Sequence, residues 1–518
     1  MRQIAPKELR GWITHRGELA LLDAREEGEF GAGHLFWAVP CPLSRAELRL
    51  PALLPRLSTR VVCVDDGRGL AERLAGLLEG MGGTDVHVLQ GGTSAWEAAG
   101  FVLFTGVNVP SKAFGEWVEH HYGTQSIDAP ELKAWQDEGR DVVVLDSRPM
   151  DEFHRMSIPG GINVPGGELA YRIGDLAPDP NTVVVVNCAG RTRSIMGAES
   201  LRRAGVPNQV VALRNGTMGW QLAGLEVARG GTERYADGTP RTAAQALERA
   251  RAFAESAGVG VIGPLDLDRF EEDPDRTLYV LDVRDPAEFA ARHRPGSRNA
   301  PGGQLVQATD QWIGVRGARV ALVDDDGVRA RMTGAWLRLM GHRDVFVVEG
   351  GLDDLAEPGP APMLATTVAS LADEVDAIPA GAAVLDLARS IDFRAGHIEG
   401  AVWAVRTRLE ALRGRLADAG SVVITSPDGV LARLAVAEAQ HLTRSTVRTL
   451  RGGTLGWVAR GGSLEASRTD PADAACVDFY LRPYDRNSGV EAAMHAYLSW
   501  EIDLVHEIER DGTVAFGV

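Results

Sequence analysis

Residues 143–153, VVLDSRPMDEF, combine an apolar run with an acid, a spacer and an arginine, and this pattern recurs along the chain. The related segments are ALLDAREEGEF (20–30), YVLDVRDPAEF (279–289) and AVLDLARSIDF (383–393). Each begins with a short apolar run that is typical of a strand, and each ends on an acid and Phe. A segment that returns at intervals of roughly 100 to 140 residues indicates a tandem repeat of domains.

Three further elements follow each copy in the same order. A turn leads into a short strand, as in MSIPGGINVP (156–165), and a β-branched run then ends in a loop that precedes a helical pattern. The last element is a strand that ends at a glycine pair or its variant, as in VVALRNGTMGW (210–220). Apolar strands that alternate with helices are typical of parallel sheets covered by helices. We therefore predict an α/β fold with four tandem modules, each a parallel β-sheet flanked by helices.

These repeats divide the chain into five parts. The predicted modules are residues 1–104, 125–231, 259–358 and 365–463, and residues 464–518 form a partly helical C-terminal extension. Two insertions, near 101–124 and 232–257, have the pattern of linkers that each contain a helix. The periodicity of residues 479–509 suggests a helix that packs on the body of the protein, although it does not indicate a role.

The composition narrows the functional class. Of 518 residues, 45% are apolar and 24% charged, and the formal net charge is −17. This acidic balance argues against a large nucleic-acid or anionic-membrane interface. No apolar stretch is long enough to cross a bilayer and the N-terminus lacks a signal-like apolar region, so we expect a cytoplasmic protein.

Four cysteines occur singly, at Cys41, Cys63, Cys188 and Cys476, without any CxxC pair. This usage suggests neither a disulfide framework nor a zinc site, and the histidines show no metal-ligand spacing. We expect no metal and no organic cofactor. Cys41, Cys63 and Cys476 are interpreted as small buried apolar residues.

Cys188 differs from the other cysteines because it ends a valine run in the segment VVVVNCAGRTRS (183–194). When the modules are aligned on the glycine that ends the following helix, its counterparts are Asp65, Asp324 and, with a looser match, Ser426. The second module is therefore the one that carries a thiol at this position.

The four elements in this order resemble the rhodanese family of sulfurtransferases over most of the chain. In that family, the loop after the third element carries a cysteine that accepts a sulfane sulfur as a persulfide and passes it on. The resemblance implies that Cys188 is the catalytic nucleophile of the second module. Because a carboxylate cannot form a persulfide, it also implies that the other modules are inactive. By the family's pattern, Asp146 and Arg148 form a buried structural ion pair.

One departure concerns a histidine. The family commonly has Gly-His before Ile-Pro-Gly, and Gly33-His34 and Gly396-His397 keep it, whereas the second module has Met156-Ser157. We interpret this histidine as structural, so that its loss does not remove activity from the second module.

The chemistry of sulfur transfer requires a thiolate, whereas a free thiol with a pKa of about 8.5 is mostly protonated at neutral pH. Backbone N–H groups of a curled loop and the N-terminus of a helix that begins near Ser194 would favour the anion. Arg191 and Arg193 would add fixed charge, and the hydroxyl groups of Thr192 and Ser194 could bind the persulfide or the oxygens of the donor. The predicted substrate-binding residues are Ala189, Gly190, Arg191, Thr192, Arg193 and Ser194.

We therefore predict a two-step exchange in which Cys188 takes sulfur from a small anionic donor and a thiophilic acceptor, such as cyanide or a thiol, removes it. The two arginines favour thiosulfate over mercaptopyruvate or glutathione persulfide. The oligomeric state is left open, with a homo-oligomer among the options.

Two other functional classes are compatible with parts of the pattern. A non-enzymatic persulfide carrier or scaffold remains an alternative because three of the four modules lack the cysteine. A cysteine phosphatase is less favoured, because its usual His-Cys-x5-Arg pattern is not met by Asn187 before the thiol and Ser194 six residues after it.

Overall fold

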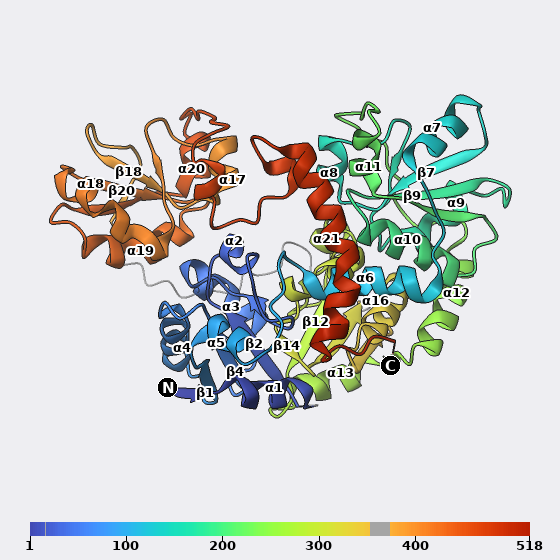
Figure 1. Cartoon of the computed structure of the whole chain (residues 1–518), viewed down its shortest axis with the longest axis horizontal. Helices are drawn as coiled ribbons and strands as arrows, with labels where there is room; N and C mark the ends of the chain where they lie inside the picture. The colour runs from blue at the N-terminus through green and yellow to red at the C-terminus, as the bar shows by residue number, and fades with distance from the viewer. Residues whose placement is uncertain (16, 353–372, 518) are drawn as a thin grey trace.

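The computed structural model describes residues 1–15, 17–352 and 373–517. Four α/β units and a long C-terminal helix, α21 (Val490–Asp511), make up the molecule (Figure 1). The predicted fold class is confirmed, since each unit contains a parallel sheet flanked by helices. The predicted limits at 358 and 365 lie outside the described residues, and the domain boundaries stay predictions.

All four sheets share one strand order. In the first it is β1-β5-β4-β2, with β3 also beside β2, and the second has β6-β10-β9-β7-β8. The third and fourth are β11-β16-β15-β12-β13 and β17-β21-β20-β18-β19. The strands of the first two sheets are β1 (Arg2–Ile4), β2 (Leu19–Asp23), β3 (Val39–Pro40), β4 (Val61–Val64), β5 (Val86–Leu89), β6 (Ser126–Ile127), β7 (Val142–Asp146), β8 (Ile162–Asn163), β9 (Val183–Asn187) and β10 (Val210–Leu213). Those of the last two are β11 (Gly260–Ile262), β12 (Leu278–Asp282), β13 (Arg298–Asn299), β15 (Arg319–Val323), β16 (Asp344–Val348), β17 (Glu374–Val375), β18 (Ala383–Asp386), β19 (Val402–Trp403), β20 (Val422–Thr425) and β21 (Val447–Leu450).

Helices cover the faces of each sheet. In the first two modules they are α1 (Pro6–Thr14), α2 (Glu27–Phe30), α3 (Ala46–Leu53), α4 (Leu70–Gly80), α5 (Gly92–Ala98), α7 (Ala129–Asp137), α8 (Met150–Arg155), α9 (Leu169–Leu176), α10 (Thr192–Arg203) and α11 (Gly216–Leu222). In the last two they are α13 (Pro264–Glu271), α14 (Pro286–Ala291), α15 (Gly302–Gln307), α16 (Val328–Leu339), α17 (Ser390–Ala395), α18 (Arg413–Asp418), α19 (Val430–Gln440) and α20 (Gly453–Ala459). Short 3₁₀ turns complete the connections.

The ladder register identifies equivalent residues in the four modules. Each leading aspartate lies opposite the last residue of the strand that carries the loop, in the pairs Asp23↔Val64, Asp146↔Asn187, Asp282↔Val323 and Asp386↔Thr425. The residues that follow these strand ends are Asp65, Cys188, Asp324 and Ser426. The structural alignment therefore pairs the same residues as the sequence alignment, including the looser match at Ser426.

The first and third modules share a β-sheet and a hydrophobic core. Strand β14 (Val315–Arg316) of the third module pairs antiparallel with β2 and so enlarges the first sheet. Tyr279 of the third module donates its hydroxyl proton to the carbonyl oxygen of Leu53, at 2.6 Å, within a hydrophobic core that both modules share. The first sheet is thus not purely parallel, which the sequence pattern did not predict.

The two predicted linkers are structural parts of the body. Helix α6 (Val109–Tyr122) packs against α10 and α21 and buries most of its length, and α12 (Ala243–Ser256) packs against α16 and α9. The helix predicted in each of the insertions 101–124 and 232–257 is therefore present, and it is packed into the body of the protein. Their apolar faces complete a core between the second and third modules.

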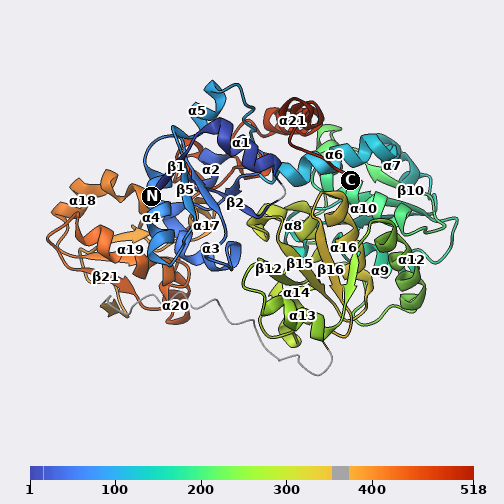
Figure 2. The ribbon, with the colours of Figure 1, turned by 90° about the horizontal axis from the view of Figure 1, so that it is seen from below.

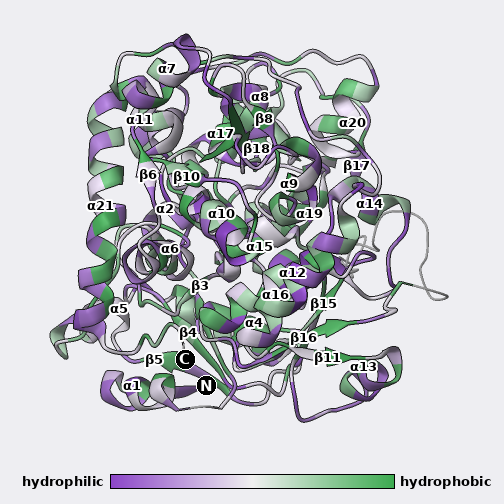
Figure 3. Ribbon diagram, turned by 90° about the vertical axis from the view of Figure 1, so that its right-hand side faces the viewer, coloured by the Kyte–Doolittle hydropathy of each residue, from purple (hydrophilic) through white to green (hydrophobic). Residues whose placement is uncertain are grey.

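The fourth module lies beside the first (Figure 2), where Arg406 pairs with Glu47 and Arg408 pairs with Glu29. From there the chain crosses to α21, whose hydrophobic and hydrophilic residues alternate along its length (Figure 3). The apolar residues Leu498 and Leu504 are buried. The predicted helix of the extension is thus present, and it packs on the body.

Candidate active site

Strand β9 brings Cys188 to the carboxyl edge of the second sheet. The strand is fully buried between β7 and β10, and Cys188 itself is 2% exposed. The loop is short, because α10 begins at Thr192, close to the start expected near Ser194. The carbonyl oxygen of Cys188 accepts hydrogen bonds from the backbone N–H and the hydroxyl of Thr217, at 2.8 and 3.0 Å. These bonds fix the backbone from which the thiol projects.

Gly216 allows this close approach of backbone to backbone. Its φ is +52°, in the left-handed region, and a Cβ there would overlap the carbonyl oxygen of Cys188. Gly92 has the same role in the first module, with φ +59° and a virtual Cβ that would overlap the carbonyl oxygen of Asp65. The terminal glycine of the repeat is therefore required by the geometry of the loop.

The backbone N–H groups of residues 189–193 have no hydrogen-bond acceptor among the described residues. They belong to the loop and the first turn of α10, where unpaired N–H groups and the helix dipole both favour an anion. The thiol of Cys188 projects from the same loop. An anionic sulfur or a bound oxyanion would satisfy these donors.

In the first module the chain itself fills the equivalent position. The carboxylate of Asp65 accepts hydrogen bonds from the backbone N–H groups of Gly67 and Leu70, both at 2.8 Å, and of Ala71, at 3.2 Å. In the third module, Asp324 similarly accepts from Ala330 at 2.9 Å. These loops carry their own anion.

Arg193 lies beside the thiol but is paired. Its guanidinium donates two hydrogen bonds to the carboxylate of Glu152, both at 2.7 Å. Burial alone would raise the pKa of Glu152, but the charge and hydrogen bonds of Arg193, together with the charges of Arg482 and Arg148, lower this pKa to about 2. The pair is therefore neutral overall, so the fixed charge expected from Arg193 is already balanced by Glu152.

Arg191 is directed toward α6, where it anchors the loop. Its guanidinium donates to both carboxylate oxygens of Glu116, at 2.8 and 2.7 Å, and also contacts Glu119. Burial, together with the charges of Glu501 and Glu119, raises the pKa of Glu116 to about 7 despite this pairing. Like Arg193, Arg191 is already paired with a carboxylate.

The two hydroxyl groups expected to contact sulfur have other partners. Thr192 donates its hydroxyl proton to Glu501 at 3.2 Å, and Ser194 donates to the carbonyl oxygen of Arg191 at 2.8 Å. Both bonds stiffen the start of α10. Among the predicted substrate-binding residues, the groups left for a ligand are thus the backbone N–H groups of Ala189, Gly190, Arg191, Thr192 and Arg193.

Asp146 and Arg148 form a buried bidentate ion pair, at 2.8 and 2.7 Å. Arg148 also donates to the carbonyl oxygen of Met156, at 2.7 Å, and so ties the strand end to the following turn. The pair Asp23–Arg25 repeats this arrangement in the first module. The Asp-x-Arg motif therefore holds the module together.

The histidine absent from the second module has a packing role where it occurs. His34 stacks on Phe30 with ring centroids 3.8 Å apart, and His397 stacks on Phe393 at 3.7 Å. Burial lowers the pKa of His34 to about 4, which keeps it neutral. Ser157 takes the same place in the second module and keeps the equivalent antiparallel bridge. These contacts favour the structural interpretation of the histidine.

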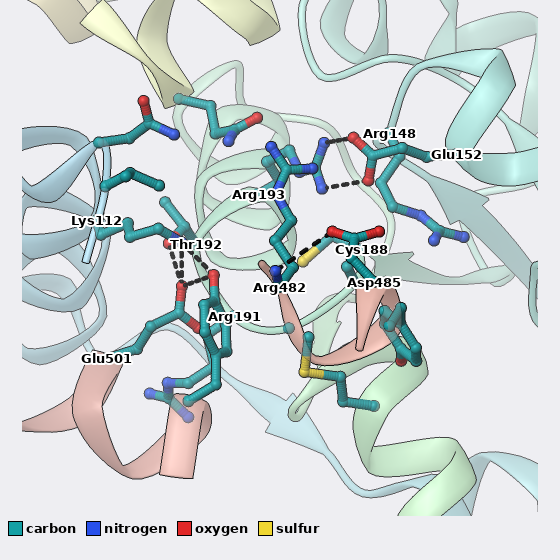
Figure 4. A pocket seen from close by; sticks show the side chains of 18 of the residues that line it. Lys112, Arg148, Glu152, Cys188, Arg191, Thr192, Arg193, Arg482, Asp485 and Glu501 are labelled. Carbon is teal, nitrogen blue, oxygen red and sulfur yellow. Dashed lines mark hydrogen bonds and ion pairs between the residues drawn. The ribbon is translucent and has the colours of Figure 1, made fainter. Parts of the chain in front are cut away.

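The C-terminal extension supplies one wall of the pocket above Cys188, a cavity of about 90 Å³ (Figure 4). Its contributions, which sequence reasoning missed, are Tyr480, Arg482, Tyr484, Asp485, Tyr497 and Glu501. Glu501 accepts hydrogen bonds from Lys112 of α6, at 2.8 Å, and from Tyr497, at 3.0 Å. The extension has no counterpart in the repeats, so comparison between modules gave no signal for it.

The other cysteines lie away from this pocket. Cys41 and Cys63 are fully buried in the first module, and burial raises the pKa of both thiols, that of Cys41 to about 12. In the described ranges, no helix is both long and apolar enough to cross a membrane.

Comparisons with known proteins agree with the architecture. A family model for the rhodanese-like domain matches residues 5–99, 128–223 and 266–357, together more than half of the chain. A crystal structure of thiosulfate sulfurtransferase from Pseudomonas aeruginosa is 46% identical, with a TM-score of 0.94, and the similarity covers 100% of both chains. A curated HTH-type transcriptional regulator of Mycobacterium tuberculosis is 35% identical over 101 residues, which are 19% of this chain and 43% of the regulator.

The chain thus spans less than half of that regulator but the whole of the Pseudomonas protein. The match to three successive modules, each with the strand order described above, decides the classification. The chain belongs to the rhodanese-like domain family.

Proposed function

We propose that the chain is a sulfurtransferase that carries a sulfane sulfur on Cys188 as a persulfide. The donor is a small anion, thiosulfate first, and the acceptor is a thiophile such as cyanide or a thiol. The observation that carries the proposal is the set of unpaired N–H groups of residues 189–193 in the loop that presents the thiol of Cys188. The similar Pseudomonas protein, described as a thiosulfate sulfurtransferase, supports the choice of donor.

The exchange balances without a cofactor. In the first step, the Cys188 thiolate attacks the outer sulfur of thiosulfate, a sulfur–sulfur bond forms to Cys188, and the donor's own bond breaks with its electron pair leaving on sulfite. In the second step, the acceptor attacks the outer sulfur of the persulfide and the thiolate leaves. With cyanide the product is thiocyanate.

The loop favours both anionic states of this cycle. The N–H groups of residues 189–193 and the N-terminus of α10 stabilise the thiolate before attack and the persulfide anion after it. Because the donors are backbone groups held by the bonds of Thr217 and Ser194, they need no rearrangement between the two states. The loop thus stabilises charge on either sulfur.

The test is thiocyanate formation from thiosulfate and cyanide by the wild type, Cys188→Ser and the control Cys476→Ala. We expect activity in the wild type and in the control, and none in Cys188→Ser. Mass spectrometry after donor treatment should find an adduct of about 32 Da on Cys188. A wild type that forms no thiocyanate would contradict the proposal, and an adduct without turnover would favour a carrier instead.

A further inference from the structure

The segment that leads into α21 closes over the pocket of Cys188. It includes the short 3₁₀ turn Pro483–Asp485 and is held against α8 of the second module. Arg155 of α8 donates to the carboxylate of Asp485, at 3.0 Å, and to the carbonyl oxygen of Tyr484, at 2.8 Å. The backbone N–H of Arg482 also donates to Asp485. These bonds hold Arg482 and Tyr484 at the rim and wall of the cavity.

Charge pairing separates Arg482 from the other cations that line the pocket. Those others are each matched to a carboxylate, in the pairs Arg148–Asp146, Arg193–Glu152, Lys112–Glu501, Arg155–Asp485 and Arg191–Glu116. The guanidinium of Arg482 has no ion-pair partner in the part of the chain that the structure describes. Arg482 is therefore the cation of this lining that has no ion-pair partner among the described residues.

Arg482 also lies close to the reacting group. Arg482 and Arg193 both lie near Cys188 (Figure 4). Burial raises the pKa of Glu152, and the charge of Arg482 helps Arg193 to lower it. Arg482 is exposed, so an anion can reach its guanidinium from solvent.

Tyr484 provides a second, independent feature of the same wall. Its hydroxyl oxygen is buried, lines the pocket and has no hydrogen-bond partner among the described residues. Burial raises the pKa of Tyr484, so the hydroxyl keeps its proton at neutral pH and remains a donor. An unpaired buried donor costs free energy unless a ligand accepts its hydrogen bond.

We propose that Arg482 and Tyr484 bind the oxyanion end of the sulfur donor and thereby select doubly charged donors. This inference rests on the proposed sulfur transfer. As the sulfur–sulfur bond of thiosulfate breaks, its electron pair and negative charge move onto the leaving sulfite, whose oxygens the guanidinium and the hydroxyl hold. The loop N–H groups stabilise the sulfur at Cys188, and the C-terminal segment stabilises the leaving group.

The test separates the two half-reactions and compares Arg482→Gln with the matched control Arg486→Gln, an exposed arginine outside the pocket lining. In Arg482→Gln, we expect sulfur loading from thiosulfate to lose about 10- to 100-fold in kcat/KM, through both KM and kcat, because the contact binds the donor and also stabilises the charge that moves onto the leaving sulfite. Discharge of the loaded enzyme by cyanide should change by less than about twofold, because sulfite has already left. Arg486→Gln should match the wild type.

Donor charge provides a second readout. Methanethiosulfonate carries one negative charge fewer than thiosulfate, and its leaving group after sulfur transfer is a sulfinate. The ratio of kcat/KM for thiosulfate to that for methanethiosulfonate should therefore be smaller in Arg482→Gln than in the wild type. Tyr484→Phe, which removes a hydroxyl without a partner, should lower loading by about 3- to 10-fold and leave the fold intact. If the wild type is active and Arg482→Gln loads sulfur at the same rate, this inference is overturned but the proposed function is not. An inactive wild type would overturn the proposed function.

Discussion

The loops after β9 and after β4 occupy the same position in two modules but differ in the residue that follows the strand. In the first module, Asp65 places a permanent negative charge on the N–H groups at the start of α4. In the second, Cys188 stands at that position, and the N–H groups of Gly190 and Arg193, which correspond to those of Gly67 and Leu70, are left unpaired. The N-terminus of a helix favours an anion in either case. The N–H groups of the first loop are thus occupied by its own carboxylate, whereas those of the second are available to a sulfur anion.

The substitution Cys188→Asp should convert the second loop into the first and produce the largest effect. A carboxylate cannot form a persulfide, so sulfur transfer should fall by at least about 10³-fold. The thermal midpoint should rise relative to Cys188→Ser, because the carboxylate would accept the N–H groups of residues 189–193. Assays of thiocyanate formation and thermal unfolding measure both changes. A midpoint that falls below that of Cys188→Ser would show that the two loops are not equivalent.

The substitutions Gly216→Ala and Gly92→Ala test whether the glycines matter for the loop itself. Each adds a Cβ that would overlap the carbonyl oxygen of the residue at the shared position and strains a backbone with positive φ. Both should lower the thermal midpoint. Displacement of the thiol by the first should reduce turnover by about 10- to 100-fold, whereas the second should leave turnover unchanged. A loss of turnover in Gly92→Ala would link the first module to the reaction.

The substitution Asp65→Ala asks how much the internal anion stabilises the first loop. It leaves three backbone N–H groups without their acceptor, so we expect the free energy of unfolding to fall by about 1–3 kcal/mol. The matched variant Cys188→Ala removes a side chain that accepts none of the loop N–H groups and should cost less. Denaturant unfolding of both variants measures the difference. Equal losses would mean that the carboxylate contributes no more than the thiol.

The repeated strand ends predicted the fold and the position of the thiol from the sequence. The Asp-x-Arg pairs, the glycines after the last strand and the alignment of Cys188 with Asp65 are local features, each set by residues close together in one repeat. Local geometry of this kind is visible in a linear pattern, because every copy repeats the same spacing.

What the sequence did not predict depends on contacts between distant segments. The partners of Arg191 and Arg193 lie on α6 and α8, and the wall with Arg482 comes from the C-terminal segment, some 300 residues from the loop. The motif contains the two arginines but not their carboxylate partners, so the sequence does not show that their charge is balanced. Likewise, β14 joins the first sheet from a module two units away.

The smallest expected effect is a pH dependence that separates the two loops. Glu116, which anchors Arg191, has its pKa raised from the ordinary 4.5 to about 7 by burial. A raised carboxyl pKa gives stability that is present below the unfolded value and is lost as the pH rises through the folded value. Between pH 5 and pH 8, the wild type should therefore lose of the order of 1 kcal/mol more than Glu116→Gln, which cannot titrate.

The first loop offers the matched control. Arg68 stands three residues after Asp65, as Arg191 does after Cys188, and it pairs with Asp66, an acid at the surface. Although burial opposes it, hydrogen bonding to Arg68 lowers the pKa of Asp66, so this carboxylate stays ionised from pH 5 to pH 8. Asp66→Asn and the wild type should therefore keep parallel stability curves over that range. If Glu116→Gln also runs parallel to the wild type, burial of the Arg191 anchor is not what distinguishes the open loop from the closed one.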